Sequence, residues 1–215
     1  FACLFYGAPG TGKTETVLQL ARKTGRALMQ VNISTIKDKY VGESEKNIKN
    51  LFDRYRQLVE SEPIAPILFF NEADAIFNKR SENTVRAVDK MENAIQNIIL
   101  QEMETLEGIL IATTNLTSNL DSAFERRFIY KVRFAAPSLE AKQAIWQSMI
   151  PSLSEEDAAT LASAYNFSGG QIENIARKHT VEYILAGEEP SVATIRKFCD
   201  AECLSNVSPR RAIGF

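Results

Sequence analysis

Gly7-Ala8-Pro9-Gly10-Thr11-Gly12-Lys13-Thr14 fits the pattern GxxxxGK[ST], and it lies between an apolar run, residues 1–6, and a helical pattern, residues 13–24. Glycines at these spacings let a loop curl so that its backbone N–H groups and the following helix N-terminus face phosphate oxygens. In such a loop Lys13 reaches the β- and γ-phosphates and the Thr14 hydroxyl binds Mg²⁺. The stretch therefore predicts a nucleoside triphosphate site, and a chance Gly-rich turn is the disfavoured alternative.

Short apolar runs and helical patterns alternate along the first part of the chain. The strand patterns cover residues 1–6, 26–33, 67–70, 109–113 and 129–134, and helical spacing follows residues 48–59 and 85–106 as well as 13–24. Strands that alternate with helices form a mostly parallel sheet covered on both faces. We therefore expect an α/β domain over residues 1–136.

No strand pattern follows Pro137, where four helical segments are predicted instead. Ser138, Ser154, Ser168 and Ser191 stand where helices would begin, and Gly187 stands where the third would end. We expect a small helical domain over residues 137–205 and a C-terminal tail over residues 206–215.

Composition excludes several classes of protein. The chain has 215 residues, 45% of them hydrophobic and 24% charged, which suits a globular fold rather than a disordered one. A net charge of −2 provides no basic field for nucleic acid, and no apolar run is long enough for a bilayer. Three cysteines, an odd number, favour a reducing compartment. We expect a cytoplasmic protein with no nucleic-acid or membrane partner, and a chain beginning with Phe1 rather than Met is expected to be part of a longer protein.

The strand over residues 67–70 ends in Asn71-Glu72-Ala73-Asp74, where enzymes with this loop place an acid near the metal. Here the first position is an amide, so Asn71 offers oxygen without negative charge. We expect Glu72 to activate the attacking water, the alternative being a solvated charge, and Asp74 to be structural at a helix start. Nucleotide binding should survive this substitution better than turnover does.

Two further positions complete the candidate catalytic set. Asn115 follows the strand over residues 109–113 and is placed to position water, although a lone Asn there is commonly a turn residue. Arg126 and Arg127 precede the last strand, and a guanidinium can stabilise phosphoryl-transfer charge in trans. Alternatively, this arginine pair is a solvated surface feature.

In this order the motifs resemble the AAA+ ATPases, and among them the AAA group that includes katanin, spastin and other protein-remodelling ATPases. The resemblance implies a P-loop fold with a parallel five-stranded sheet ordered 5-1-4-3-2, a helical lid and a homo-oligomeric ring, usually a hexamer. It implies ATP rather than GTP. It also implies that Asn115 is sensor 1, that Arg126 and Arg127 act on the neighbouring subunit's site, and that Gly169 and Gly170 lie near the nucleotide. The expected nucleotide-contacting residues are Ala8, Pro9, Gly10, Thr11, Gly12, Lys13, Thr14, Glu15, Gly169 and Gly170.

Tyr40-Val41-Gly42 resembles the pore loop with which this group grips a polypeptide. An aromatic-apolar tip between charged neighbours also breaks the strand-helix pattern, although Tyr40 could instead pack under its own helix. Residues 78–83 are a second pore-loop candidate, or a solvated connection.

The sequence thus predicts an ATPase that binds ATP and Mg²⁺, with Thr14 and Asn71 at the metal, and remodels or translocates a protein substrate. A second hypothesis is a nucleotide-gated assembly module in which Asn71 keeps hydrolysis slow or absent. A module acting on DNA is disfavoured by the net charge and by the aromatic pore loop.

Overall fold

The computed structural model describes residues 1–32, 43–78, 87–116, 118 and 120–204, and these form two compact units. The first unit comprises Phe1–Ala8 and Gly12–Ala135, and the second comprises Pro9–Thr11 and Ala136–Phe215. Among the described residues no helix is long and apolar enough to cross a bilayer. The predicted Tyr40-Val41-Gly42 loop and most of residues 78–83 lie outside the described ranges.

The first unit is built on a five-stranded parallel sheet with the strand order β2-β3-β4-β1-β5. The strands are β1 (Ala2–Gly7), β2 (Leu28–Asn32), β3 (Ile67–Asn71), β4 (Ile109–Thr114) and β5 (Tyr130–Phe134). The predicted order 5-1-4-3-2 is confirmed. The three central strands are almost entirely buried, as their continuous apolar runs predict for a sheet covered on both faces.

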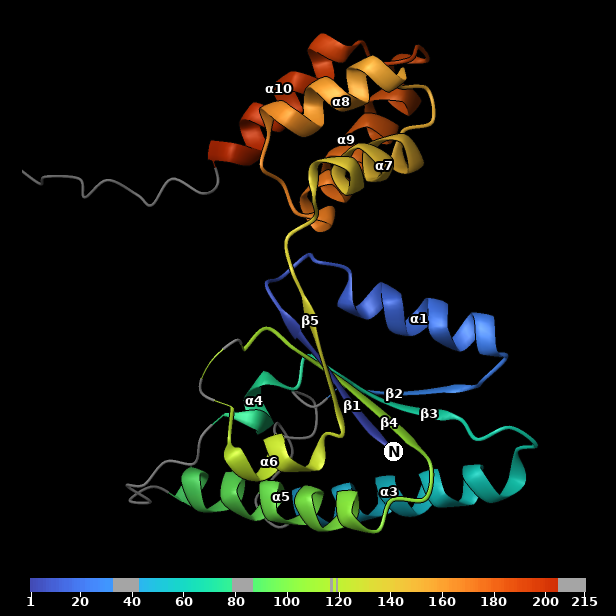
Figure 1. Ribbon diagram of the computed structural model, residues 1–215, viewed down its shortest axis with the longest axis vertical. Coiled ribbons are helices and arrows are strands. Elements are labelled where there is room, and N and C mark those ends of the chain that lie inside the picture. The colour runs from blue at the N-terminus through green and yellow to red at the C-terminus, as the bar shows by residue number, and fades with distance from the viewer. Residues whose placement is uncertain (33–42, 79–86, 117, 119, 205–215) are drawn as a thin grey trace, which may run out of the picture. The chain divides into compact units, whose positions relative to one another are not determined.

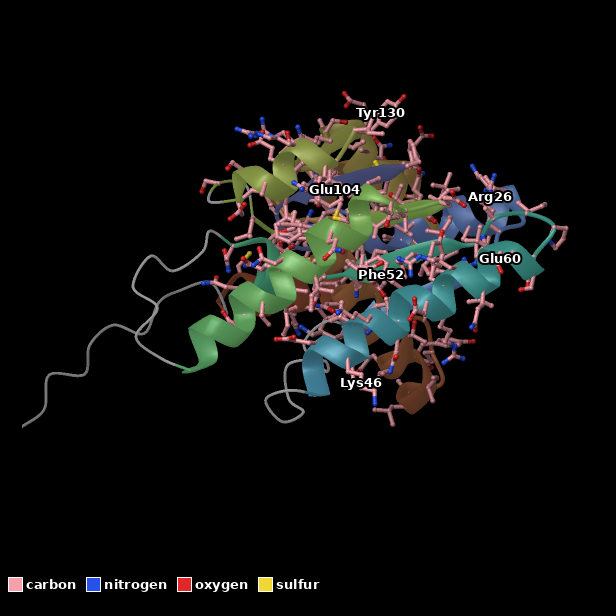
Figure 2. All side chains as sticks on the ribbon, turned by 90° about the horizontal axis from the view of Figure 1, so that it is seen from below. Arg26, Lys46, Phe52, Glu60, Glu104 and Tyr130 are labelled. Atoms are coloured by element: carbon pink, nitrogen blue, oxygen red, sulfur yellow. The ribbon has the colours of Figure 1, made fainter. Side chains whose placement is uncertain are left out.

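Helices cover both faces of this sheet (Figure 1). One face is covered by α1 (Lys13–Thr24), and the other by α3 (Glu43–Ser61), α5 (Ala87–Glu104) and α6 (Ser122–Arg127). Figure 2 views this second face and shows α3 and α5 side by side, with Lys46 and Glu60 near the two ends of α3. Phe52, on the inner side of α3, is fully buried and meets the Phe70 ring edge-on, with 6.0 Å between ring centroids.

A buried tyrosine fastens α3 to the sheet. The Tyr55 hydroxyl accepts a hydrogen bond from the Ile109 backbone N–H at 2.8 Å and lies 2.9 Å from the Pro66 carbonyl oxygen, to which it donates. A Cβ at Gly108, whose φ is +153°, would lie 2.4 Å from this hydroxyl. Glycine is therefore required where β4 begins.

A four-residue helix, α4 (Asp74–Phe77), follows β3 and is held at its C-terminal end. The Asp121 N–H donates to the Phe77 carbonyl at 2.8 Å, and the Phe77 ring packs against the rings of Phe124 and Phe128. The buried Gln96 amide of α5 donates to the Ile76 carbonyl at 2.7 Å. These contacts join α4 to both α5 and α6.

The second unit is helical and has its own core around Trp146, which is fully buried. Its helices are α7 (Leu139–Met149), α8 (Glu155–Ala164), α9 (Gly169–Ala186) and α10 (Val192–Leu204). Ser138, Ser154 and Ser168 accept hydrogen bonds from backbone N–H groups at the first turns of α7, α8 and α9, and Gly187 ends α9 in the left-handed conformation.

Candidate nucleotide site

The sheet order brings three polar segments to one edge. Strands β1, β4 and β3 are neighbours and parallel, so their carboxyl ends lie together. The glycine-rich loop follows β1, Asn71 ends β3, and Asn115 follows β4. In open α/β sheets this edge is where ligands bind.

The Lys13 ammonium lies at the centre of this edge and is buried. It donates to the carbonyl oxygens of Gly7 and Ala8, both at 2.8 Å, and to Asn115 Oδ1 at 2.9 Å. Burial lowers the pKa of Lys13 from its usual 10.5, and the carboxylates of Asp74 and Glu72 oppose that shift. A charged phosphate placed here would raise that pKa again, because it favours the ammonium form.

Thr14 and Asn71, the two residues that the sequence predicts at the metal, are joined directly by a hydrogen bond. The Thr14 hydroxyl donates to Asn71 Oδ1 at 3.0 Å, and the Thr113 hydroxyl donates to the same oxygen at 3.1 Å. Because Thr14 uses its proton in this bond, its lone pairs are left for a cation. These two donors also fix which end of the Asn71 amide faces the loop.

Glu72 has an exposed side chain and an unusual backbone. Its φ is +52°, the only positive value for a non-glycine residue among those described, and its N–H donates to Thr113 Oγ1 at 3.0 Å. The left-handed region costs a non-glycine residue roughly 1 kcal/mol or more, and such strain is typical of functional sites. The turn directs the chain from β3 into α4.

Asp74 is the site residue whose contacts the sequence did not reveal. Expected only as a helix start, it accepts hydrogen bonds from the Thr114 hydroxyl, from the Asn115 N–H at 2.8 Å and from Asn115 Nδ2 at 3.2 Å. The available signal was its position two residues after Glu72, opposite the end of the neighbouring strand. Asn115 is therefore held between Lys13 and Asp74.

The structure separates the two predicted arginines. Arg127 donates to the carbonyl oxygens of Leu100 at 3.1 Å and Ala123 at 3.0 Å and pairs with Glu104, so it fastens α6 to α5. Arg126 is exposed and has no hydrogen-bond or ion-pair partner among the described residues. Neither arginine contacts Lys13 or Asn115. Helix α6 lies beside α5 on the sheet face opposite α1 (Figure 1).

Two features of the loop suit an anion. Gly12, at the N-cap position of α1, has a φ of +89°, and no side chain caps the helix. The first N–H groups of α1 therefore have no side-chain cap to occupy them. Glu15 is the only acid in its first turn, and its carboxylate pairs with Gln19 and Arg22 on the outer surface.

The tip of the loop, Pro9–Thr11, groups with the helical unit. Within that unit the Gly170 N–H donates to the Gly10 carbonyl at 3.0 Å. A Cβ at Gly170 would lie 3.0 Å from the Gly10 Cα, so a larger residue there would crowd the loop backbone. A Cβ at the neighbouring Gly169 would lie 3.3 Å from the Gly10 carbonyl oxygen.

The donors at this edge fit a nucleotide-bound Mg²⁺ better than a protein-only metal centre. Among the described residues no group of three or more histidine, cysteine or acidic side chains is placed to hold a metal. Mg²⁺ commonly binds through one or two protein oxygens, water and substrate phosphates. Thr14, backed by Asn71, meets that requirement.

Comparison with known proteins matches the part of the chain that holds this site to a family. Residues 3–136 match the family described as "ATPase family associated with various cellular activities (AAA)". This range holds all five strands except the first residue of β1, and it includes Lys13, Thr14, Asn71, Glu72 and Asn115.

Individual relatives agree. The chain is 28% identical over 183 residues to fidgetin-like protein 1 of Drosophila melanogaster. The aligned region covers 81% of this chain and 34% of that protein. The chain is 29% identical over 189 residues to spastin of Anopheles gambiae (84% and 22%), and 32% identical over 185 residues to vacuolar protein sorting-associated protein 4B of Mus musculus (81% and 40%). The chain thus spans between about a fifth and two fifths of the length of these relatives.

Proposed function

The chain belongs to the AAA family of ATPases, and we propose that it binds Mg-ATP at the Lys13 edge and hydrolyses it to remodel or move a protein substrate. The observation that carries this proposal is the convergence of Lys13, Thr14, Asn71 and Asn115 at the ends of three adjacent parallel strands. A structural Gly-rich turn would not require this set of donors and acceptors around a buried ammonium.

In this proposal, the residues of the glycine-rich loop bind the nucleotide. The residues after β3 and β4 act on the attacking water. The uncapped N-terminus of α1 and Lys13 bind the phosphates, and Lys13 exchanges its carbonyl partners for phosphate oxygens. Thr14 would hold Mg²⁺, which neutralises charge on the β- and γ-phosphates when bound. Glu72 accepts the proton of the attacking water, and the Asn115 amide orients that water.

An arginine from a second copy of the chain would complete the site. Arg126 suits this role because it is exposed and unpaired among the described residues, whereas Arg127 is occupied by α5. A guanidinium supplied in trans stabilises the charge that develops on the transferred phosphoryl group. The site is then shared, as in the homo-oligomeric ring that the sequence leads us to expect.

The alternative function is a nucleotide-gated assembly module, and Asn71 favours it. An amide in place of a carboxylate removes one negative charge beside the metal, while the hydrogen bonds from Thr14 and Thr113 preserve the geometry. Such a site would keep nucleotide affinity and lose turnover.

Steady-state Mg-ATP hydrolysis over a wide range of protein concentration tests both functions. Specific activity that rises with concentration and disappears in Glu72→Gln supports a shared, hydrolysing site. ATP binding without turnover, recovered in Asn71→Asp, supports the assembly module. A chain that binds no nucleotide contradicts both.

A further inference from the structure

Asp74 directs its carboxylate away from its own helix. It is the first residue of α4, whose N-cap is Ala73 and has no side-chain cap. The carboxylate instead accepts three hydrogen bonds from the end of β4: from the Thr114 hydroxyl, the Asn115 N–H and the Asn115 amide. A helix-capping role therefore does not explain this acid.

The two ends of the Asn115 amide meet opposite charges. Its Oδ1 accepts from the Lys13 ammonium at 2.9 Å, and its Nδ2 donates to Asp74 Oδ2 at 3.2 Å. Rotating the amide by half a turn would place its NH₂ group against an ammonium and its oxygen against a carboxylate. Two ionic hydrogen bonds, each stronger than a neutral one, thus select a single orientation.

Glu72, the other acid after β3, does not share this role. Its side chain is exposed, and only its backbone N–H is hydrogen-bonded in the cluster. The two carboxylates therefore have separate surroundings, one open to solvent and one directed at Asn115.

We propose that Asp74 is a positioning residue that fixes the Asn115 amide for catalysis, an inference that rests on the proposed ATPase function. When a nucleotide draws Lys13 toward its phosphates, the bonds from Thr114 and from the Asn115 backbone keep the carboxylate in place. Asp74 then holds the Asn115 oxygen toward the reacting groups without touching them.

Asp74→Asn is the sharpest variant because it keeps the shape of the side chain. The new amide can still accept at one oxygen, but its NH₂ group would oppose the Asn115 NH₂ group. We expect kcat to fall on the order of 10 to 100-fold, with KM changed less than about threefold. Asp157→Asn, the same exchange in the first turn of α8, is the matched control and should leave both constants unchanged.

A double-mutant cycle separates positioning from a general structural role. In the Asn115→Ala background, Asp74→Asn should reduce kcat by less than about twofold, because the amide that it positions is already gone. An equal loss in both backgrounds would overturn the proposal.

A measurement on the nucleotide-free chain tests the geometry independently of hydrolysis. The Asn115 side-chain NH₂ resonances, identified by their loss in Asn115→Ala, should exchange slowly with water and show an NOE to the Asp74 β-protons. Free, rapidly exchanging resonances would refute the positioning role, whether or not Asp74→Asn folds. An inactive wild-type chain with a fixed amide would instead remove the ATPase function and leave the geometry established.

Discussion

The Thr14 hydroxyl donates a hydrogen bond to the Asn71 side-chain oxygen at 3.0 Å, linking the start of α1 to the end of β3. Both residues are the ones that the proposed function places beside a nucleotide-bound metal. The bond preserves the arrangement that a carboxylate would give, without its charge. The electrostatic strength of the site, rather than its shape, is what the amide changes.

Restoring that charge should strengthen the site. Asn71→Asp keeps an oxygen for both hydroxyl donors and adds one negative charge, so we expect Mg²⁺ affinity and turnover to rise on the order of 10-fold or more. A Mg²⁺ titration of ATP hydrolysis measures both. Asn50→Asp, an exposed change on α3, controls for added charge, and an equal gain there would contradict the prediction.

Substituting the two arginines of α6 should have different effects, one on hydrolysis and the other on stability. Arg126→Ala should lower hydrolysis roughly 100-fold or more and leave thermal stability unchanged, because its side chain is exposed and unpaired among the described residues. Arg127→Ala should lower the free energy of unfolding by about 1–3 kcal/mol, because it removes bonds to Leu100, Ala123 and Glu104. Activity assays beside urea unfolding distinguish them, and the reverse result would reassign their roles.

Nucleotide affinity should depend on the protonation of Lys13. Burial lowers its pKa below 10.5, whereas bound phosphate favours the charged form, so affinity should fall as pH rises through that lowered value, with proton uptake on binding. Calorimetry in buffers of different ionisation enthalpy measures this uptake. In Lys13→Arg the guanidinium stays charged, and a persisting decline in affinity would point to another group.

The lowered pKa of Lys13 also determines whether its contribution to the free energy of unfolding rises or falls with pH. Between the folded value and 10.5 the unfolded chain binds more protons at this residue, so the contribution of Lys13 to the free energy of unfolding should rise with pH. Urea unfolding of the wild type and of Lys13→Met, compared across that range, measures the difference. A wild-type stability that falls relative to the variant would contradict it.

Tyr55→Phe should destabilise the first unit. The change leaves the Ile109 N–H and the Pro66 carbonyl without their hydroxyl partner in a buried place, which costs about 1–3 kcal/mol. Urea unfolding measures the loss. Tyr130→Phe, an exposed tyrosine of β5, is the control and should change stability little.

Much of the architecture followed from local signals. The GxxxxGK[ST] stretch gives the loop and the helix after it, and continuous apolar runs in β1, β3 and β4 indicate buried parallel strands. Serine caps and Gly187 mark the ends of the helices in the second unit, because each meets a local backbone requirement.

Contacts between distant segments were not predictable in this way. The sequence placed Arg126 and Arg127 alike, and only the packing of α6 on α5 distinguishes them. Asp74 could be predicted as a helix start, yet its bonds reach across 41 residues to Asn115. The short α6 was not predicted as a helix, because six residues are too few for a clear helical period.

The single helical turn α4 begins with Asp74, which accepts a hydrogen bond from Asn115, and ends with Phe77, which packs against α6. A helix of four residues spans only about 6 Å, so a displacement of Asp74 is expected to move Phe77 as well. If Arg126 serves a neighbouring copy as proposed, α4 connects Asn115 of a chain's own site to the helix α6 that carries Arg126. A change at one site would then reach the neighbouring site through α4, and the two sites would be coupled.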